Sequence, residues 1–186
     1  MKQYFSNLAP TSCQEALKAN DFKHGTYTIF PKGGMLSIKV VCKLNTKSQA
    51  QTEVSHNMTD YDFVTGYENR VDGKIIKLAY AEPLSKLIML VQLAKVCWQK
   101  IYFKDCNQVG ILNWSFLLDR DGKELSFQDS ECHCRAFEAC YDDGREILLV
   151  GNVTSKTKLP LTGVSVGDTG HSGEDTSVLI GSLECL

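Results

Sequence analysis

The chain lacks a long hydrophobic run, a block of charge of one sign, and any internal repeat. Its most apolar window, residues 84–94, is about half the length of a helix that crosses a bilayer, and it is bounded by Lys86 and Lys95. The chain has 20 Lys and Arg residues and 22 Asp and Glu residues, so the net charge is only -2, and the two signs alternate along the chain. These absences predict no membrane span within the chain and no strong attraction to nucleic acid, mineral or anionic membrane.

Motifs for cofactors are missing as well. The sequence has no phosphate-binding loop and no dinucleotide fingerprint. We therefore expect no cofactor.

Eight cysteines and three glycosylation sequons are the most informative residues that are present. An even number of cysteines suits a fully disulfide-bonded domain, and disulfides persist in oxidising compartments. The sequons begin at Asn57, Asn113 and Asn152, and none has proline in its middle position. Together these residues predict a secreted or lumenal protein. The cysteines are Cys13, Cys42, Cys97, Cys106, Cys132, Cys134, Cys140 and Cys185.

The first ten residues, MKQYFSNLAP, contain no apolar stretch of the kind that a signal peptide needs. We reconcile this with the oxidising environment by expecting the chain to be an N-terminally incomplete fragment. A length of 186 residues suits one domain. We expect residues 1–10 to be a flexible segment and residues 11–186 to form the domain.

The pattern of apolar, turn and capping residues predicts an α+β domain with many short strands. A short helix is expected over residues 13–20, capped by Thr11-Ser12, and a bridge from Cys13 to Cys42 would tie it to the following hairpin. Such a bridge stabilises a fold by about 3 kcal/mol or somewhat more. The clearest helix opens at Glu82-Pro83. Its predicted apolar face comprises Leu84, Leu87, Ile88, Val91, Ala94 and Trp98. Strands are predicted over 26–30, 36–42, 53–56, 74–80, 99–103, 112–118, 123–127, 147–150, 164–167 and 177–183, with a turn at 119–122.

Two short motifs near the end of the chain resemble those of hydrolases. Gly163-Val-Ser-Val-Gly167 matches the nucleophile elbow around Ser165, but no helix pattern follows it, and the acid and histidine come almost at once. Asp168-Thr-Gly170 matches the aspartic-protease triplet, but only sixteen residues remain after it. Both matches are interpreted as accidental. A secreted hydrolase that uses Ser165 or Asp168 is kept as an alternative from another class.

Cys132-His-Cys134 and Cys140 lie close enough in sequence to suggest a metal site. Structural zinc sites usually separate their ligands by two to four residues and repeat the pair, which this segment does not. Disulfides are therefore preferred over zinc, and a cytosolic zinc protein is a further alternative. His24, His56 and His171 have no partner at ligand spacing and are expected to be structural or surface residues.

Several segments in order resemble fibrinogen-like domains and the related C-propeptides of fibrillar collagens. They begin with Ser12-Cys-Gln-Glu-Ala-Leu17, Gly25-Thr-Tyr-Thr-Ile29 and Val40-Val-Cys42. Further segments are closest to the fibrinogen-like region of contactin-associated, neurexin-IV-type proteins. These are Thr52-Glu-Val-Ser-His56, Val64-Thr-Gly-Tyr-Glu68, Trp114 to Phe127, Cys132-His-Cys134, and Ile180-Gly-Ser-Leu-Glu-Cys185. The resemblance implies a shortened fibrinogen-like fold from Ser12 onward.

The resemblance also implies the bridges Cys13–Cys42 and Cys97–Cys106, and it leaves three pairings open among Cys132, Cys134, Cys140 and Cys185. The chain departs from the family in three ways. Gln51 stands where Trp is expected, two later cysteines are absent, and the subdomain that holds calcium and the binding pocket is missing. Only the scaffold and the extracellular setting are therefore carried over.

The sequence thus predicts a non-enzymatic extracellular module of an adhesion or matrix protein that binds an extracellular protein or glycan through its loops. A component of an extracellular organic matrix, including a mineralised one, is the related alternative. No catalytic, cofactor-binding or metal-binding residue is assigned.

Overall fold

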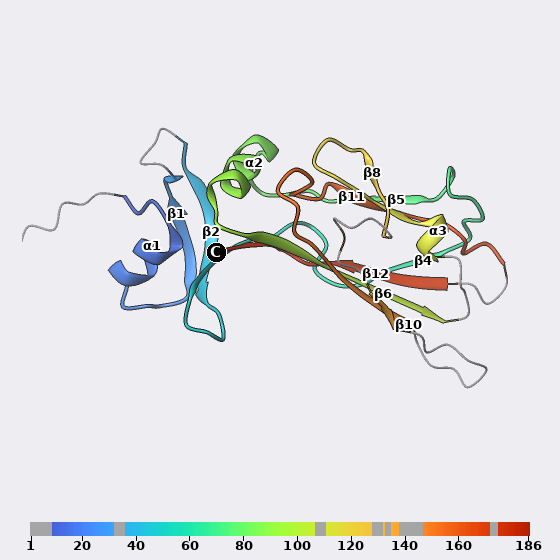
Figure 1. Cartoon of the computed structure of the whole chain (residues 1–186), viewed down its shortest axis with the longest axis horizontal. Coiled ribbons are helices and arrows are strands. Elements are labelled where there is room, and N and C mark those ends of the chain that lie inside the picture. The colour runs from blue at the N-terminus through green and yellow to red at the C-terminus, as the bar shows by residue number, and fades with distance from the viewer. Residues whose placement is uncertain are drawn as a thin grey trace, which may run out of the picture.

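The structure of the chain, a computed structural model, describes residues 9–31, 36–106, 111–127, 132, 135–137, 147–171 and 175–186. Cys134, Cys140 and most of the predicted flexible segment 1–10 lie outside these residues. The molecule is elongated, and two antiparallel sheets carry most of it (Figure 1). Sheets, helices and disulfides together agree with the predicted disulfide-braced α+β class.

The N-terminal part combines a short helix with three strands, as predicted up to residue 44. These elements are α1 (Cys13–Ala19), β1 (Gly25–Ile29), β2 (Ile38–Leu44) and β3 (Ala50–Val54). The hydroxyl of Ser12 accepts the Glu15 N–H at 3.3 Å and so caps α1. A disulfide between Cys13 and Cys42 holds α1 against β2. The predicted cap, hairpin and bridge are confirmed.

Strand β3 begins three residues earlier than the predicted strand 53–56. The cause is a tight turn built by Asn45, whose Oδ1 accepts the N–H groups of Lys47 and Gln49, each at 2.9 Å. This turn returns the chain soon enough for Ala50 to pair with Leu44.

Strand β6 (Cys97–Cys106) is the centre of the larger, nine-stranded sheet. It pairs with β10 (Ile147–Val153) on one edge, and with β12 (Asp175–Ile180) and then β13 (Leu183–Cys185) on the other. Strand β13 also pairs with β3, so it joins the N-terminal hairpin to the rest of the sheet. The outer strands are β4 (Asp62–Thr65), beside β12, and β9 (Arg135–Phe137), beside β10.

The sequence predicts one strand over 177–183, but the structure has two, β12 and β13. Gly181 and Ser182 separate them, and the Gly181 N–H donates to the Lys100 carbonyl at 2.7 Å. A β-carbon on Gly181 would lie 3.3 Å from that of Lys100. The small residue therefore suits the break at this point.

The smaller sheet has four strands in the order β5-β11-β7-β8. Their bounds are β5 (Lys74–Lys77), β7 (Phe116–Leu118), β8 (Glu124–Leu125) and β11 (Gly163–Val166). The predicted strand 112–118 is wrong in its first half, where helix α3 (Ile111–Trp114) stands. Short apolar runs do not distinguish helix from strand, which explains the error.

Helix α2 (Leu84–Leu93) begins after Pro83, as predicted. Leu87, Leu90 and Val91 are its buried residues. Trp98, which the sequence places on the same helical face, instead lies in β6 because the helix ends at Leu93.

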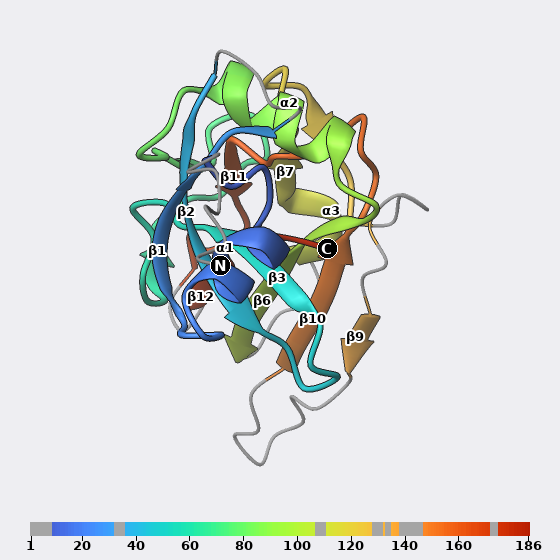
Figure 2. The same cartoon turned by 90° about the vertical axis from the view of Figure 1, so that its left-hand side faces the viewer.

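The hydrophobic core lies between the layers, with the smaller sheet and α2 on the same side of the larger sheet (Figures 1 and 2). Ile101 and Phe103 of β6 are buried there, and the Phe103 ring meets Phe127 edge-on with centroids 5.0 Å apart. The alternate residues of β6 point the other way, and Lys100 among them is exposed. We call this other side the open face of the larger sheet.

Candidate functional site

The C-terminal strand β13 is fixed by a disulfide between Cys185 and Cys97, whose Cα atoms are 4.1 Å apart. The two residues are direct register partners in β13 and β6. Next to them, the Trp98 indole N–H donates to Glu184 at 2.6 Å. The bridge therefore lies at the junction between the two parts of the larger sheet.

This bridge corrects the predicted pairing of Cys97 with Cys106. The two cysteines are the first and last residues of β6, and nine residue steps in a strand span about 30 Å. Disulfides require Cα atoms within roughly 7 Å of each other. A single uninterrupted strand thus excludes the expected bridge.

The pairing expected among Cys132, Cys134, Cys140 and Cys185 is wrong as well, because Cys185 bonds to Cys97. Cys132 is disulfide-bonded, and its backbone forms an isolated bridge with Val153 at the end of β10. Cys134 and Cys140 are outside the described residues.

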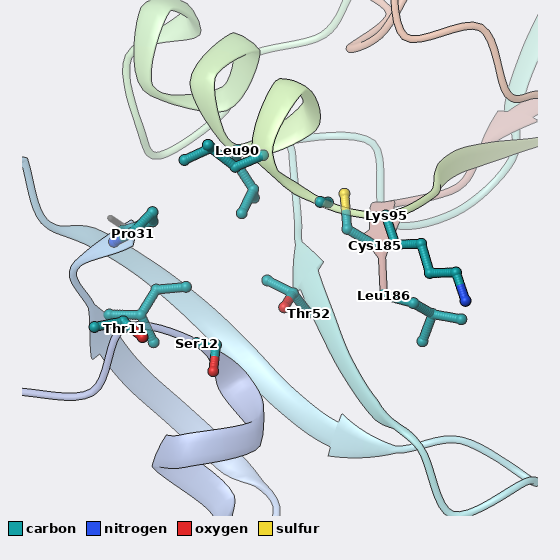
Figure 3. Close-up of a pocket in the computed structure, with 11 residues that line it drawn as sticks. Thr11, Ser12, Pro31, Thr52, Leu90, Lys95, Cys185 and Leu186 are labelled. Carbon is teal, nitrogen blue, oxygen red and sulfur yellow. The ribbon is translucent and has the colours of Figure 1, made fainter. Parts of the chain in front are cut away.

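A cleft of about 230 Å³ opens beside this junction, between the start of α1 and the end of α2 (Figure 3). In Figure 3, Thr52 of β3 lies between Leu90 and Ser12, and Cys185 of β13 lies on the side of Lys95. Most of the lining is aliphatic or hydroxyl-bearing. It comprises Thr11, Ser12, Ile29, Pro31, Thr52, Leu90, Leu93, Ala94, Lys95, Cys185 and Leu186.

The hydroxyl-bearing wall of the cleft is held in place by Glu15. The backbone N–H and the hydroxyl of Thr11 donate to Glu15 Oε2 at 2.7 and 2.9 Å. These two hydrogen bonds hold the pKa of Glu15 below its usual value. Ser12, in turn, is fixed by its capping hydrogen bond, so this wall is fixed before any ligand arrives.

The opposite wall is fixed through the last residues of the chain. The Leu186 N–H donates to the Val96 carbonyl, and the Lys95 N–H donates to the Leu186 carbonyl, both at 2.9 Å. The Lys156 ammonium caps the end of α2 by donating to the Ala94 carbonyl. A rigid cleft with aliphatic walls and a few hydroxyls can take one apolar side chain of a partner.

A second, smaller hollow of about 130 Å³ lies on the open face of the larger sheet. It is lined by Lys43, Glu53, Lys100, Tyr102, Gly181, Ser182 and Glu184. Lys43 pairs with Glu53 and, at 3.1 Å, with Glu184. Burial opposes the charge on Lys43, but the two carboxylates outweigh it and hold the pKa of Lys43 above its usual value.

Ser165, the residue of the nucleophile-like motif, lies within strand β11 and is 1% exposed. Its register partners are Ile75 of β5 and Phe116 of β7, so the residue is in the middle of the smaller sheet. His171 follows in the sequence but pairs with Glu68 at the surface, 3.3 Å away. This is a strand rather than the strand-to-helix turn of a nucleophile elbow.

Asp168, from the second motif, has a φ of 58° and lies in the turn after β11. The neighbouring Thr169 donates its N–H to the Tyr67 carbonyl at 2.7 Å, and its hydroxyl accepts the Tyr67 N–H at 3.2 Å. The Asp-Thr-Gly sequence is thus part of a turn that attaches β11 to the segment after β4.

The three sequons lie on different elements. Asn57 is exposed in the loop after β3, Asn113 is exposed in α3, and Asn152 is partly exposed within β10. Sequence reasoning found these asparagines but neither the cleft nor the hollow.

The alternation of Trp98, Lys100, Tyr102 and Lys104 along β6 was a readable sign of an exposed strand face.

Within the described part of the chain, no helix is long and apolar enough to cross a membrane. No group of three His, Cys, Asp or Glu side chains there is placed to hold a metal ion. Compared with known protein families, the chain matches no family model.

Proposed function

We propose that the chain is a non-enzymatic extracellular module of an adhesion or matrix protein. One observation carries the proposal: every cysteine whose side chain the structure describes is disulfide-bonded. Such bonds are maintained outside the reducing cytosol. The sequons at Asn57 and Asn113 lie on exposed residues, where an attached glycan would extend into solvent.

We further propose that the scaffold is a shortened fibrinogen-like one. The bridge from Cys13 to Cys42 supports this, because it joins the opening helix to the strand Val40-Val-Cys42, as the resemblance implies. The bridge from Cys97 to Cys185 is a departure from that pattern. It favours a scaffold that shares the N-terminal part of the family and differs at its C-terminal junction.

The cleft beside β13 is our candidate for the contact with a protein partner. Its volume suits one side chain, and Leu90, Leu93 and Ile29 give it an aliphatic lining. Bridges from Cys13 and Cys185 fix both sides of the cleft, so partner binding requires little ordering of the module.

The setting is tested by the intact mass of the protein secreted from eukaryotic cells behind an added leader. The mass change on reduction counts the disulfides, and the mass change on glycosidase treatment reports the attached glycan. We expect four disulfides, since all eight cysteines can pair, together with attached glycan. Eight free thiols and no glycan would contradict the extracellular proposal.

The cleft is tested by a substitution that places a charge in it. We expect Leu93→Glu to abolish attachment of cells or matrix proteins to the immobilised module, since a carboxylate opposes apolar burial. Leu84→Glu is the matched control, because Leu84 is a half-buried leucine on the same helix that does not line the cleft. Equal attachment to both variants and to the parent would rule out the cleft as the contact.

A further inference from the structure

The three sequons differ in what the folded protein does with the asparagine side chain. Asn57 already serves the structure, because its Oδ1 accepts the Ala79 N–H at 2.7 Å and its Nδ2 donates to the Lys77 carbonyl at 3.3 Å. Asn152 is different. Its Oδ1 is buried and has no hydrogen-bond partner. An unsatisfied buried acceptor of this kind costs about 1–3 kcal/mol and calls for an explanation.

The position of Asn152 in the sheet places its side chain on the open face. Asn152 is the direct register partner of Lys100 in β6, and Val150 is the partner of Tyr102. Side chains that are directly opposite have Cβ atoms about 5 Å apart, and diagonal neighbours about 7–8 Å apart, within reach of long and aromatic side chains. Lys100 is therefore the direct neighbour of Asn152 on β6, and Tyr102 and Trp98 are its two diagonal neighbours on the same face.

The small hollow of the open face begins directly beyond Lys100 and Tyr102. These two residues line it, and Gly181 and Ser182 line its far side. Gly181 donates to the Lys100 carbonyl, so Gly181 and Asn152 are on opposite sides of β6, each about one strand spacing of 4.8 Å away. A group attached to Asn152 that reaches over Lys100 arrives at the hollow.

The hollow matches a sugar in size and in chemistry. Its volume of about 130 Å³ is too small for a drug-sized ligand but leaves room for one saccharide unit. The Ser182 hydroxyl and the Lys100 ammonium are donors, the carboxylates of Glu53 and Glu184 are acceptors, and Tyr102 offers an aromatic ring. Saccharide hydroxyls both donate and accept, and C–H faces of sugars pack on such rings.

We propose that Asn152 carries an N-linked glycan whose first N-acetylglucosamine packs on Lys100 and Tyr102 and extends toward the hollow. In the transfer, Asn152 Nδ2 loses a proton and bonds to the anomeric carbon of the sugar. The bond from that carbon to the diphosphate of a lipid-linked oligosaccharide breaks, and the lipid diphosphate leaves. The sugar then supplies hydroxyl and N–H donors next to the unpartnered Oδ1. This proposal rests on the extracellular setting, because the transfer occurs in the secretory pathway.

Site mapping gives the first test. The secreted chain is deglycosylated enzymatically in H₂¹⁸O, which converts each occupied asparagine to a labelled aspartate, and its peptides are sequenced by mass spectrometry. We expect label at Asn152. An unlabelled Asn152 in a disulfide-bonded chain would overturn the proposal and leave the extracellular setting standing, whereas eight free thiols would overturn the setting itself.

Packing of the sugar is tested by thermal melting after the glycans are trimmed to single N-acetylglucosamine units. We expect Thr154→Ala, which removes this sequon, to lower the melting temperature by about 2–4 °C, the shift that an aromatic contact gives in a domain of this size. Thr59→Ala, which removes the sequon at Asn57, is the matched control. We expect loss of the sugar on Asn57 to cause no comparable fall in the melting temperature.

The decisive comparison is whether the sugar on Asn152 still stabilises the folded protein when Tyr102 or Lys100, on which it is proposed to pack, is replaced. In a Tyr102→Ala background with trimmed glycans, adding Thr154→Ala is expected to leave the melting temperature unchanged. Lys100→Ala, a change at an exposed residue, is expected to reduce the effect of Thr154→Ala and serves if Tyr102→Ala does not fold. An undiminished stabilisation by the sugar in both variants would contradict the packing.

Discussion

At the residue scale, His56 shows how burial and two hydrogen bonds fix one protonation state. Its Nε2 faces the Gly181 carbonyl at 3.0 Å, and its Nδ1 accepts the Met58 N–H at 3.2 Å. The ring also meets Tyr80 edge-on, with centroids 5.3 Å apart. Burial lowers the pKa of His56 below 6.5, against a smaller opposing effect of the Gly181 carbonyl. The neutral ring with its proton on Nε2 is thus the native form.

The stability of the protein is expected to fall as the pH drops below 6.5. In that range His56 binds a proton in the unfolded chain while the folded ring stays neutral, so the unfolded state takes up more protons. The loss starts at about the unfolded pKa and is complete below the folded one. Urea midpoints between pH 8 and pH 4.5 measure it. His56→Gln should remove this component, and an NMR titration of His56 at or above its ordinary pKa would contradict the prediction.

Gln99 is another buried polar residue, with no exposed surface, and it contacts Tyr80 and Gly181 as His56 does. Its amide donates to the Tyr80 hydroxyl at 3.0 Å and to the Gly181 carbonyl at 3.1 Å, and its Oε1 accepts the Leu161 N–H at 2.7 Å. One side chain thereby connects β6, the break before β13 and the approach to β11. Nothing in the sequence around Gln99 marks it as a core residue, because its partners come from segments 19 to 82 residues away.

At the scale of elements, the turn between β7 and β8 depends on Asp119, which is 2% exposed. Its Oδ1 accepts the N–H groups of Asp121 at 3.0 Å and Lys123 at 2.9 Å. We expect Asp119→Ala to lower the free energy of unfolding by about 3 kcal/mol or more, since two hydrogen bonds to a charged acceptor, each worth about 1.5–3 kcal/mol, are lost. Asp119→Asn keeps an acceptor oxygen and should cost less than half as much. Urea denaturation measures both.

Asp121→Ala is the matched control, because Asp121 is an exposed aspartate in the same turn. Its free energy of unfolding should stay within about 0.5 kcal/mol of the parent value. A cost of Asp119→Ala as small as that of Asp121→Ala would mean that the turn tolerates loss of the Asp119 acceptor.

Elements with local signals were predictable, and those set by distant contacts were not. The capping Ser12 and the turn at Asp119 act within a few residues, so the sequence shows them. Strand β4 was missed, because it exists only through pairing with β12, more than 100 residues later. Cys97 was misassigned because its pairing with Cys106 rested on the family resemblance, whereas its actual partner, Cys185, is 88 residues away in the sequence.

At the scale of the whole molecule, the larger sheet is narrowest at β13. Its three residues give three register pairs to β3 and two to β6, and they connect the N-terminal hairpin to the remaining strands. Lys43, Glu53 and Glu184 link β2, β3 and β13 across the same place. The cleft lies beside this junction. Sequence reasoning could not find the cleft, because its walls come from both sides of a junction that only the tertiary fold creates.

Removing the Cys97–Cys185 disulfide at this junction should therefore lower the free energy of unfolding more than removing the Cys13–Cys42 disulfide. The bridges close loops of 88 and 29 residues, for which the loop-entropy model gives about 4–5 and about 3–4 kcal/mol. We expect the double variant Cys97→Ala/Cys185→Ala to show the larger loss in urea denaturation, and Cys13→Ala/Cys42→Ala is the matched control.

Hydrogen exchange separates a weakened junction from general destabilisation. In Cys97→Ala/Cys185→Ala, the amides of β3 and β13 should exchange much faster, while those in the centre of β6 and β10 keep most of their protection, because the long ladder between β6 and β10 does not depend on the bridge. In Cys13→Ala/Cys42→Ala, the faster exchange should instead centre on α1 and β2. Equal acceleration over all strands in the first variant would show that β13 is no separate point of opening and that the two halves unfold as one unit.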